Sequence, residues 1–169
     1  MTHTAYPVVE IEPPHDCGIV GWFAGADLVD SFAVPLPAAR REDMRILAER
    51  AFGYPALWIR TLLFVRDRVM AVAGIKSTTE VGRTVGEGDR IGFFPILSAS
   101  PDELVVGADD SHLDFRLSLL RGRAAEGGER IVATTVVRCH NRLGRVYLAA
   151  IMPFHRIIVR ASLRRLTES

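Results

Sequence analysis

Alternating apolar and polar side chains fill much of the second half of the chain and predict β-strands there. In residues 112–119 (HLDFRLSL) every second residue is apolar, which predicts a strand with one apolar face. Residues 91–98 and 103–108 predict a hairpin around a turn at 100–102. Residues 130–140 are mostly apolar on both faces, which is typical of a central strand. The short connections between these strands predict an antiparallel sheet.

The first half of the chain contains an apolar period of three to four residues, which predicts helices. Residues 39–52 form the first predicted helix, and Gly53 ends it. The apolar residues that share one face of this helix are Met44, Leu47, Ala48 and Ala51. Residues 55–74 repeat the pattern, so that 39–74 predict a helical hairpin. Residues 77–90 are rich in Gly, Thr and charge and predict a loop.

The N-terminal segment, residues 1–25, contains three prolines and three glycines and predicts an extended arm. One short strand is expected within it, at residues 6–11. Residues 27–36 predict another strand, and the prolines near its end place it at the edge of the sheet. The length of the remaining chain predicts that residues 26–169 form a single domain.

A long helix closes the chain and begins near Asn141, whose side chain is a good N-cap. Pro153 lies within this helix and predicts a bend. The apolar residues fall into two groups on a helical projection. The broader group, called here the main stripe, consists of Leu143, Tyr147, Ala150, Ile151, Phe154, Ile157, Ile158 and Ala161. The narrower group, the second strip, consists of Leu148, Met152, Val159, Leu163 and Leu166.

We expect the main stripe of the closing helix to pack on the sheet, with the arginines of the helix at the rim. The second strip then has no packing partner in the predicted fold. Either the sheet wraps far around the helix and covers this strip, or another chain covers it, because so many apolar residues exposed together favour association.

Charge is uneven along a chain whose net charge is only +1. Such a small net charge excludes a global field that attracts nucleic acid or membranes. Residues 138–169 carry seven arginines and one acid, so they hold +6 and residues 1–137 hold −5. A basic amphipathic helix can lie on an anionic membrane. Because the main stripe is predicted to face the sheet, burial within the fold is the favoured interpretation.

Cysteine use and targeting signals predict a cytoplasmic protein. Cys17 and Cys139 match no metal spacing, so we expect free thiols in a reducing compartment. The five histidines show no ligand spacing, so neither a metal nor another cofactor is expected. The N-terminus lacks the features of a signal peptide. No uncharged apolar run reaches about 18 residues, so no membrane span is expected.

The polar face of the strand at 112–119 offers candidate acid–base groups. His112, Asp114 and Arg116 occupy alternate positions and therefore share one face. Asp114 and Arg116 could pair there, and His112 could exchange a proton near neutral pH. The alternative is that these residues form the solvated outer face of a one-sided sheet.

A basic cluster at the start of the closing helix is a candidate anion site. It consists of His140, Asn141, Arg142 and Arg145. A helix N-terminus carries partial positive charge and free amides, which bind anions. The alternative is an ordinary N-cap with arginines that face solvent. Further along the helix, His155 is either a catalytic group that faces a cavity or a partly buried histidine satisfied by a neighbour.

Three segments of the chain resemble the DUF2867 family, bacterial proteins of unknown function. These are PALWIRTLLFVRD (55–67), DDSHLDFRLSLL (109–120) and TTVVRCHNRLGRVYLAAIMPFHRIIVR (134–160). The resemblance extends from about Asp27 onward, and the third segment is the most specific. The family looks like a member of the START-like, helix-grip (SRPBCC) superfamily. That implies an α+β fold in which a curved antiparallel sheet wraps around the long C-terminal helix, with an apolar cavity between them.

Three functions remain open at this point. The first is a module that binds a small hydrophobic or amphipathic molecule in the cavity, lined by Phe115, Leu117, Tyr147, Ile151, Phe154 and Ile158. The second is a small enzyme of the cyclase, hydrolase or dehydratase type that uses the same cavity, with His112, Asp114, Arg116 or His155 as acid–base groups. The third is a ligand-free domain that forms a homodimer through Leu148, Met152 and Val159.

Overall fold

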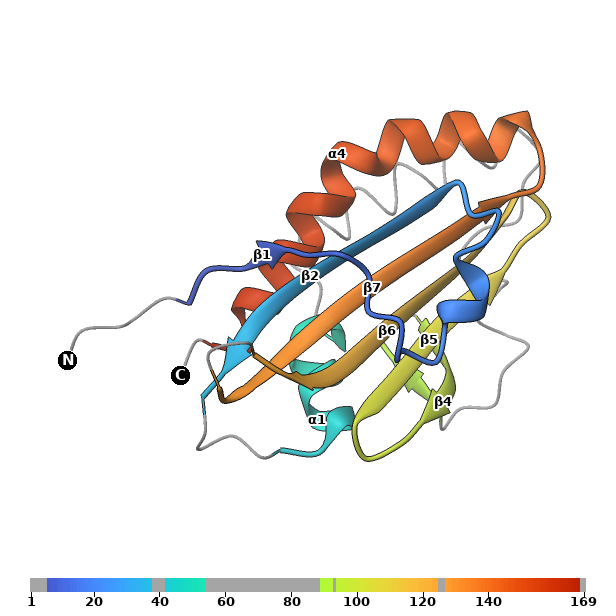
Figure 1. Cartoon of the computed structure of the whole chain (residues 1–169). Helices are drawn as coiled ribbons and strands as arrows, with labels where there is room; N and C mark the ends of the chain where they lie inside the picture. The colour runs from blue at the N-terminus through green and yellow to red at the C-terminus, as the bar shows by residue number, and fades with distance from the viewer. Residues whose placement is uncertain (1–5, 38–41, 54–88, 93, 125–126, 168–169) are drawn as a thin grey trace.

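The computed structural model is an α+β fold built on an antiparallel sheet (Figure 1). It describes residues 6–37, 42–53, 89–92, 94–124 and 127–167. The strands are β1 (Val9–Glu10), β2 (Leu28–Leu36), β3 (Arg90–Ile91), β4 (Phe94–Ala99), β5 (Glu103–Asp109), β6 (Leu113–Arg123) and β7 (Glu129–Cys139). The helical elements are the 3₁₀ turn η1 (Val20–Trp22), α1 (Met44–Ala48), the π-helical turn η2 (Glu49–Gly53) and α4 (Arg142–Arg164).

The seven described strands follow the order β1-β2-β7-β6-β5-β4-β3, and each neighbouring pair is antiparallel. β7 lies between β2 and β6, so the predicted central strand is confirmed. β2 is not the outermost strand, since β1 pairs with it at Phe32 and Ala33. The predicted edge position of β2 is therefore wrong, because the N-terminal arm adds the short strand β1 outside it. The turn between β6 and β7 contains Gly127 and Gly128 with positive φ.

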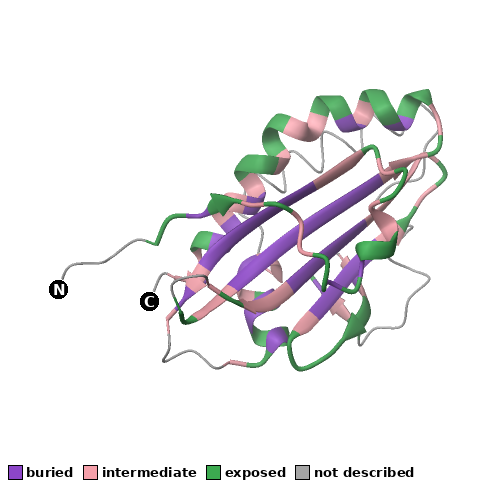
Figure 2. Cartoon of the chain, viewed as in Figure 1, coloured by how far each residue is buried: buried purple, intermediate pink, exposed green. Residues whose placement is uncertain are grey.

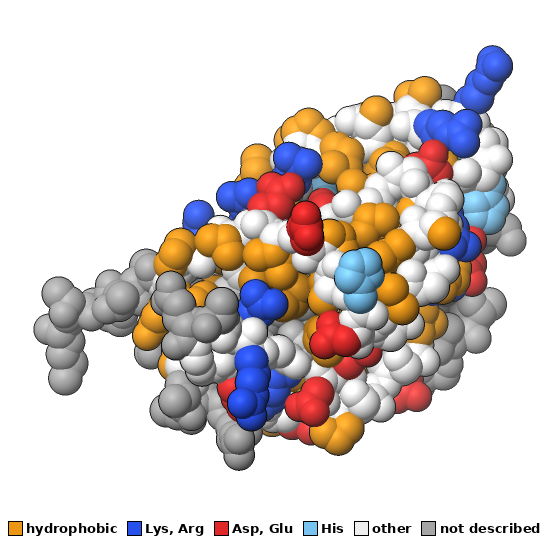
Figure 3. Space-filling model, in the orientation of Figure 1, with side chains coloured by type: hydrophobic (Ala, Val, Ile, Leu, Met, Phe, Trp, Pro, Cys, Tyr) orange, Lys and Arg blue, Asp and Glu red, His pale blue; other side chains and the backbone are white. Residues whose placement is uncertain are grey.

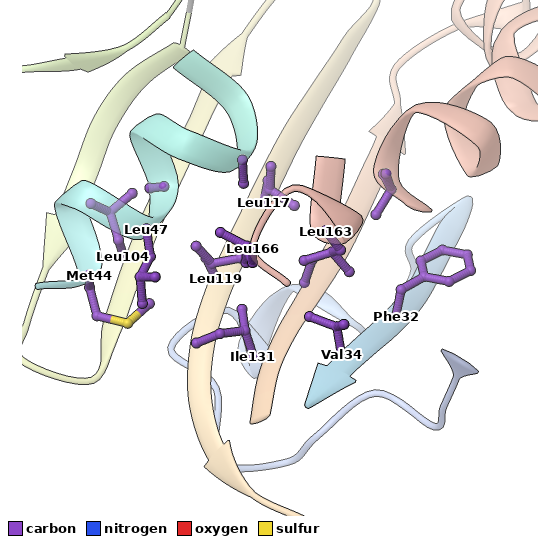
Figure 4. Close-up of a cluster of buried hydrophobic side chains, with 14 of the residues drawn as sticks. Phe32, Val34, Met44, Leu47, Leu104, Leu117, Leu119, Ile131, Leu163 and Leu166 are labelled. Carbon is purple, nitrogen blue, oxygen red and sulfur yellow. The ribbon is translucent and has the colours of Figure 1, made fainter. Parts of the chain in front are cut away.

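The inner face of the sheet carries the main hydrophobic core, which lies under α1 and α4 (Figures 1 and 4). Strand alternation and register bring Phe32, Ala133 and Leu119 side by side on this face, across β2, β7 and β6. Figure 4 shows Leu163 of α4 and Leu166, which follows the helix, among the same buried side chains. β2, β5 and β7 are buried along most of their length, whereas β1 and the end of β4 are exposed (Figure 2).

The short helix α1 packs on the inner face with the side that its sequence predicts. Asp43 begins the helix, and its side chain accepts a hydrogen bond from the backbone N–H of Arg45. The residues of the predicted face, Met44, Leu47, Ala48 and Ala51, are all buried. Gly53 is the last residue of η2, as predicted. The predicted second helix of the hairpin, residues 55–74, lies outside the described residues.

The N-terminal arm crosses the opposite face of the sheet (Figure 1). Cys17 and Ile19 are buried there against Val105 and Val136, and Trp22 packs on the same small cluster. The predicted short strand appears as β1. The sheet is therefore covered on both faces, because its outer face also carries apolar side chains that bury against the arm.

The arm is attached to the sheet by polar contacts as well. The Glu103 carboxylate accepts hydrogen bonds from the backbone N–H of Gly18 at 2.8 and 3.0 Å and from the Ser118 hydroxyl at 2.5 Å. Arg138 donates to the backbone carbonyls of Gly21, Trp22 and Ala24. These contacts hold a segment with little regular structure at one position on the sheet.

The closing helix α4 begins where the sequence predicts but turns a different side toward the sheet. The Asn141 side chain caps it by accepting a hydrogen bond from the Gly144 N–H at 3.0 Å. Its buried residues are Gly144, Leu148, Val159, Ser162 and Leu163. The second strip therefore faces the sheet, and most of the main stripe lies partly or fully exposed. The expectation that the main stripe packs on the sheet is wrong.

Close contacts and polar partners explain this rotation of α4. Gly144 approaches the backbone carbonyl of His112 so closely that a Cβ atom there would collide with its oxygen. His155, on the same side of the helix, finds a carboxylate on β2. Both strips of α4 are apolar, so hydrophobicity does not choose between them, whereas these contacts exist in one orientation alone.

Candidate functional site

A buried pair of polar side chains, Asp30 and His155, joins β2 to α4 in the core between sheet and helix. The His155 Nε2 atom lies 3.2 Å from Oδ1 and 3.1 Å from Oδ2 of Asp30. The side chain of Asp30 is 4% exposed and that of His155 18% exposed. A charged residue is rarely so buried unless a partner compensates the lost hydration, and His155 is that partner.

Strand alternation places Asp30 on the inner face, in line with Phe32 and Val34. Thr135 of β7 lies directly opposite Asp30 in the register and so shares that face. Two buried oxygen atoms at this point, Asp30 Oδ2 and Thr135 Oγ1, have no hydrogen-bond partner among the described residues. Buried polar atoms are normally satisfied, so this position has unused hydrogen-bonding capacity.

Apolar side chains surround this polar position on the strand side. Leu117 of β6 is buried beside Thr135 in the register, and Phe115 follows it on the same face. The Phe115 ring meets the ring of Phe94 edge to face, with 5.4 Å between centroids and 75° between planes. Phe94 and Phe115 are partly exposed, in contrast to the fully buried residues under Leu163.

The helix side is less uniform than the sequence predicted. Tyr147, Ile151 and Ile158, three of the predicted lining residues, are partly buried on the flank of α4 next to His155. Phe154 is exposed and does not pack against the sheet. The predicted lining set therefore divides into five residues that lie in or beside the interface and one that does not.

The candidate acid–base groups of β6 lie on the other face of the sheet, away from His155. Arg116 is largely buried and pairs with Asp109 at 2.6 Å instead of with Asp114. Its guanidinium also lies over the ring of Trp22, with Cζ 4.0 Å from the ring centroid. Asp114 pairs with His140 at 2.9 Å. Neither the predicted Asp114–Arg116 pair nor a fully solvated face is observed, because the arm covers this row.

The candidate anion cluster at the start of α4 is occupied by the protein itself. Asn141 caps the helix, and its amide Nδ2 lies 2.9 Å from the Nδ1 of His112. Arg145 pairs with Asp27 at 3.0 Å, and His140 pairs with Asp114. Arg142 is exposed. Two carboxylates beside this helix terminus repel an added anion, so the geometry favours the capping interpretation.

Among the described residues, Asp27 has a lowered pKa, which favours the charged form of its side chain. The backbone N–H of Cys139 donates to its carboxylate at 2.7 Å, and Arg145 pairs with it. These contacts, the backbone hydrogen bond first, hold the pKa of Asp27 below its usual value of 3.8. Asp27 therefore remains ionised as it connects the beginning of β2, the end of β7 and α4.

The two cysteines are free thiols and show no sign of activation. Burial raises the pKa of Cys17 and of Cys139 above the usual value of 9.0. A thiol of raised pKa is protonated near neutral pH and is a poor nucleophile. In the described ranges, no group of three His, Cys, Asp or Glu side chains is placed to hold a metal ion.

One helix in the described part of the chain, α4, is long and apolar enough to cross a membrane by length and composition. That test is weak evidence, since the core helix of a soluble protein passes it too. The C-terminal half of α4 packs in the core through Val159 and Leu163, and five arginines lie along the helix. The helix is amphipathic rather than apolar all round, which disfavours a span.

The strip predicted to form a dimer, Leu148, Met152 and Val159, does not present an exposed surface. Leu148 and Val159 are buried within the chain, and Met152 is partly buried. The expectation that this strip is left over for a second chain is wrong, because the protein's own sheet covers it.

Asp30 and Thr135 were not identified from the sequence. Asp30 does leave a signal, since it is the one charged residue within the apolar run LVDSFAV. Thr135 leaves none, because threonine is common in strands. Only the register of β2 against β7 shows that the two face each other.

Comparison with known proteins gives one match. The profile of a family described as protein of unknown function (DUF2867) matches residues 22–162, which include β2, the described strands that follow it and most of α4. No curated protein and no solved structure matches the sequence.

Proposed function

The chain belongs to the DUF2867 family, and from that premise we propose that it binds a small, mainly apolar molecule between the inner face of its sheet and α4. The observation that carries this proposal is a pair of buried oxygens that form no hydrogen bond with the described residues, Asp30 Oδ2 (3.1 Å from His155 Nε2) and Thr135 Oγ1, in apolar surroundings. Binding sites for small molecules combine apolar walls with a few fixed polar groups.

The proposed site has an apolar end and a polar end. Phe94 and Phe115 contribute partly exposed aromatic surface from the sheet, and Ile151 and Ile158 contribute aliphatic surface from the helix. Removing such surface from water supplies about 25 cal/mol per Å². A ligand of matching shape therefore gains most of its affinity at the apolar end.

The polar end selects the group that the ligand carries. An ionised Asp30 carboxylate accepts hydrogen bonds and donates none, and the Thr135 hydroxyl does both. A hydroxyl or amine on the ligand can donate to Asp30 Oδ2 or to Thr135 Oγ1, which form no hydrogen bond with the described residues. We infer that the ligand is amphipathic, with a hydrogen-bond donor at one end.

This proposal includes the finer fold assignment, a helix-grip arrangement of the START-like type. It is supported by an antiparallel sheet whose inner face packs on a long C-terminal helix. In such an arrangement the sheet and the helix form the two walls of one binding site.

Two measurements on the purified chain test the binding function. Native mass spectrometry, followed by organic extraction, detects a molecule retained from the expression host. Titration with Nile red, a neutral apolar dye, measures whether one saturable site exists. We expect saturation at one dye per chain and competition between the dye and any extracted molecule.

Matched variants of α4 locate the site. Ile151→Asp places a charge beside the proposed site and is expected to weaken dye binding about tenfold, the effect of losing one buried apolar side chain. Ile157→Asp makes the same change on the exposed side of the helix and should leave the dye affinity unchanged. Ile158→Ala is a milder second variant in case Ile151→Asp does not fold.

The proposal fails if the wild-type chain shows no saturable dye binding and retains no small molecule. It also fails if folded Ile151→Asp and Ile158→Ala bind the dye as tightly as the wild type. Circular dichroism of each variant establishes that it is folded before its affinity is compared.

A further inference from the structure

The outer side of α4 carries a continuous apolar ridge that is exposed in the described part of the chain. The outer ridge consists of Leu143, Val146, Ala150, Phe154 and Ile157, at steps of three and four residues along one line of the helix. Four of these side chains are 39%, 66%, 44% and 56% exposed, in the order Leu143, Val146, Phe154 and Ile157. At 1.5 Å per residue the ridge is about 21 Å long.

This ridge is distinct from the proposed ligand site, which lies on the other side of the helix. Figure 2 shows exposed residues along the outer side of α4, where the helix borders the molecule. Figure 3 shows hydrophobic and arginine side chains together along this border. Isolated exposed apolar residues are ordinary on protein surfaces, whereas a continuous row of them marks an interaction surface.

The charged residues of α4 itself all have the same sign. α4 contains the five arginines Arg142, Arg145, Arg156, Arg160 and Arg164 and no acidic residue. On a projection of about 100° per residue these arginines lie on one flank of the ridge.

Two carboxylates from outside α4 pair with arginines on that flank. Asp27 pairs with Arg145 at 3.0 Å, and Glu10 lies 3.8 Å from Arg156 and 3.3 Å from Arg160. Five positive charges against two negative ones leave the flank basic.

This charge pattern disfavours a second copy of the chain as the occupant. An antiparallel two-fold pairing of ridges brings the two arginine flanks to the same side, where like charges repel. A parallel pairing leaves the arginines without an acidic counterpart on the partner's α4. An anionic occupant is complementary to the flank in every orientation.

The shape of the ridge favours a flat anionic surface. α4 lies along one border of the molecule (Figure 1), so a bilayer can reach the exposed side of this helix. Interfacial helices place apolar and aromatic residues below the headgroups and arginines at the lipid phosphates. Phe154, the aromatic residue of the ridge, and the arginine flank satisfy both requirements.

We propose that the outer ridge of α4 docks the protein on an anionic membrane surface, with Phe154 and Ile157 inserted among the headgroups and the arginines on lipid phosphates. The helix lies in the interface and does not span it, because Val159, Leu163 and Leu166 on its other side stay in the core. This surface is independent of the proposed ligand site.

Sedimentation with vesicles tests the docking surface. One set of vesicles contains phosphatidylcholine alone, and another contains equal parts of phosphatidylcholine and phosphatidylglycerol. We expect the full chain to sediment with the anionic vesicles and to stay in solution with the neutral ones. Raising the salt concentration should weaken the association, since salt screens the arginine–phosphate attraction.

Two substitutions of the same kind provide the matched comparison. Ile157→Asp puts a negative charge on the ridge and is expected to weaken vesicle binding about tenfold or more. Ile46→Asp changes an isoleucine of similar exposure on α1, away from the ridge, and should bind vesicles as the wild type does. Dye binding by Ile157→Asp should remain normal, so that loss of one activity is separable from loss of the other.

Three results overturn the docking proposal. The wild type fails to sediment with anionic vesicles, or folded Ile157→Asp sediments as the wild type does. The third result would be a wild type that light scattering shows to be a dimer and an Ile157→Asp variant that it shows to be a monomer. The ridge would then be a protein interface.

Discussion

The two sides of α4 are similar in composition and opposite in environment. The inner side, with Leu148, Val159 and Leu163, is buried against the sheet, whereas the outer side, with Val146 and Ile157, faces outward. Hydrophobicity therefore does not decide which side packs inside. A short contact at Gly144 and a polar partner for His155 decide it, since each exists in only one rotation of the helix.

The largest expected effect tests whether the two sides differ in energy as they differ in burial. Leu163→Ala removes a fully buried side chain and should lower the free energy of unfolding by about 3 kcal/mol. Ile157→Ala on the outer ridge should change it by less than about 0.5 kcal/mol. Urea unfolding followed by circular dichroism measures both, and equal effects would contradict the observed orientation of α4.

Changes to the buried pair Asp30 and His155 should have the second largest effect on the free energy of unfolding. Asp30→Ala leaves His155 without its partner and should lower the free energy of unfolding by about 2 kcal/mol. The double variant Asp30→Leu with His155→Leu should recover much of that loss, because an apolar pair of similar volume needs no partner. If the double variant is stable but neither binds Nile red nor retains a small molecule, the pair contributes to binding rather than to stability. A double variant as unstable as the single one would show that the pair stabilises the fold.

Gly144 tests the contact that sets the rotation of the helix. Gly144→Ala puts a Cβ atom against the carbonyl oxygen of His112, and the resulting strain should cost about 1–2 kcal/mol of stability. Gly21→Ala is the control, because a Cβ atom there meets nothing within 4 Å. Thermal unfolding compares the two variants. A stabilised Gly144→Ala would mean that the close approach does not constrain the helix.

Asp27 tests how firmly the beginning of α4 is held, with a smaller and pH-dependent effect. Its pKa in the folded state lies below the usual 3.8, so its contribution is present above that value and is lost as the pH falls through the folded-state pKa. Asp27→Asn should therefore be less stable than the wild type by about 1 kcal/mol near neutral pH. The difference should shrink under acidic conditions.

Urea unfolding at several pH values measures the Asp27 effect, with Glu12→Gln as an exposed control. A deficit in Asp27→Asn that stays constant down to the lowest pH at which the protein folds would contradict the assignment. In that case the carboxylate's charge would not be what holds β2, β7 and α4 together at this end.

Much of the fold was predictable from local pattern. Most of the strands, the turn at Ser100–Asp102, the central position of β7 and the cap at Asn141 follow from local pattern, and the structure confirms them. The single strand predicted at 91–98 is instead two strands, β3 and β4, that pair with each other. The candidate site was less predictable. Five of the six predicted lining residues lie in or beside the interface, but the acid–base row of β6 faces the arm instead.

The contacts that escaped prediction join parts of the chain that are distant in sequence. Trp22 reaches Arg116 and Arg138 on the outer face, and Asp30 reaches His155 across 125 positions. No short-range pattern predicts such a pair, because each residue alone is ordinary in its strand, arm or helix.

By itself the sequence determined most helices and strands of the described residues and the antiparallel direction of the strands. It also determined that the last helix has two apolar sides. These follow from backbone hydrogen bonding and from the periods of two and 3.6 residues that local geometry imposes. Only the tertiary structure decided which side of α4 is buried, because Gly144 and His155 meet their partners on other elements. That choice brings His155 to the buried Asp30 and leaves the outer ridge exposed.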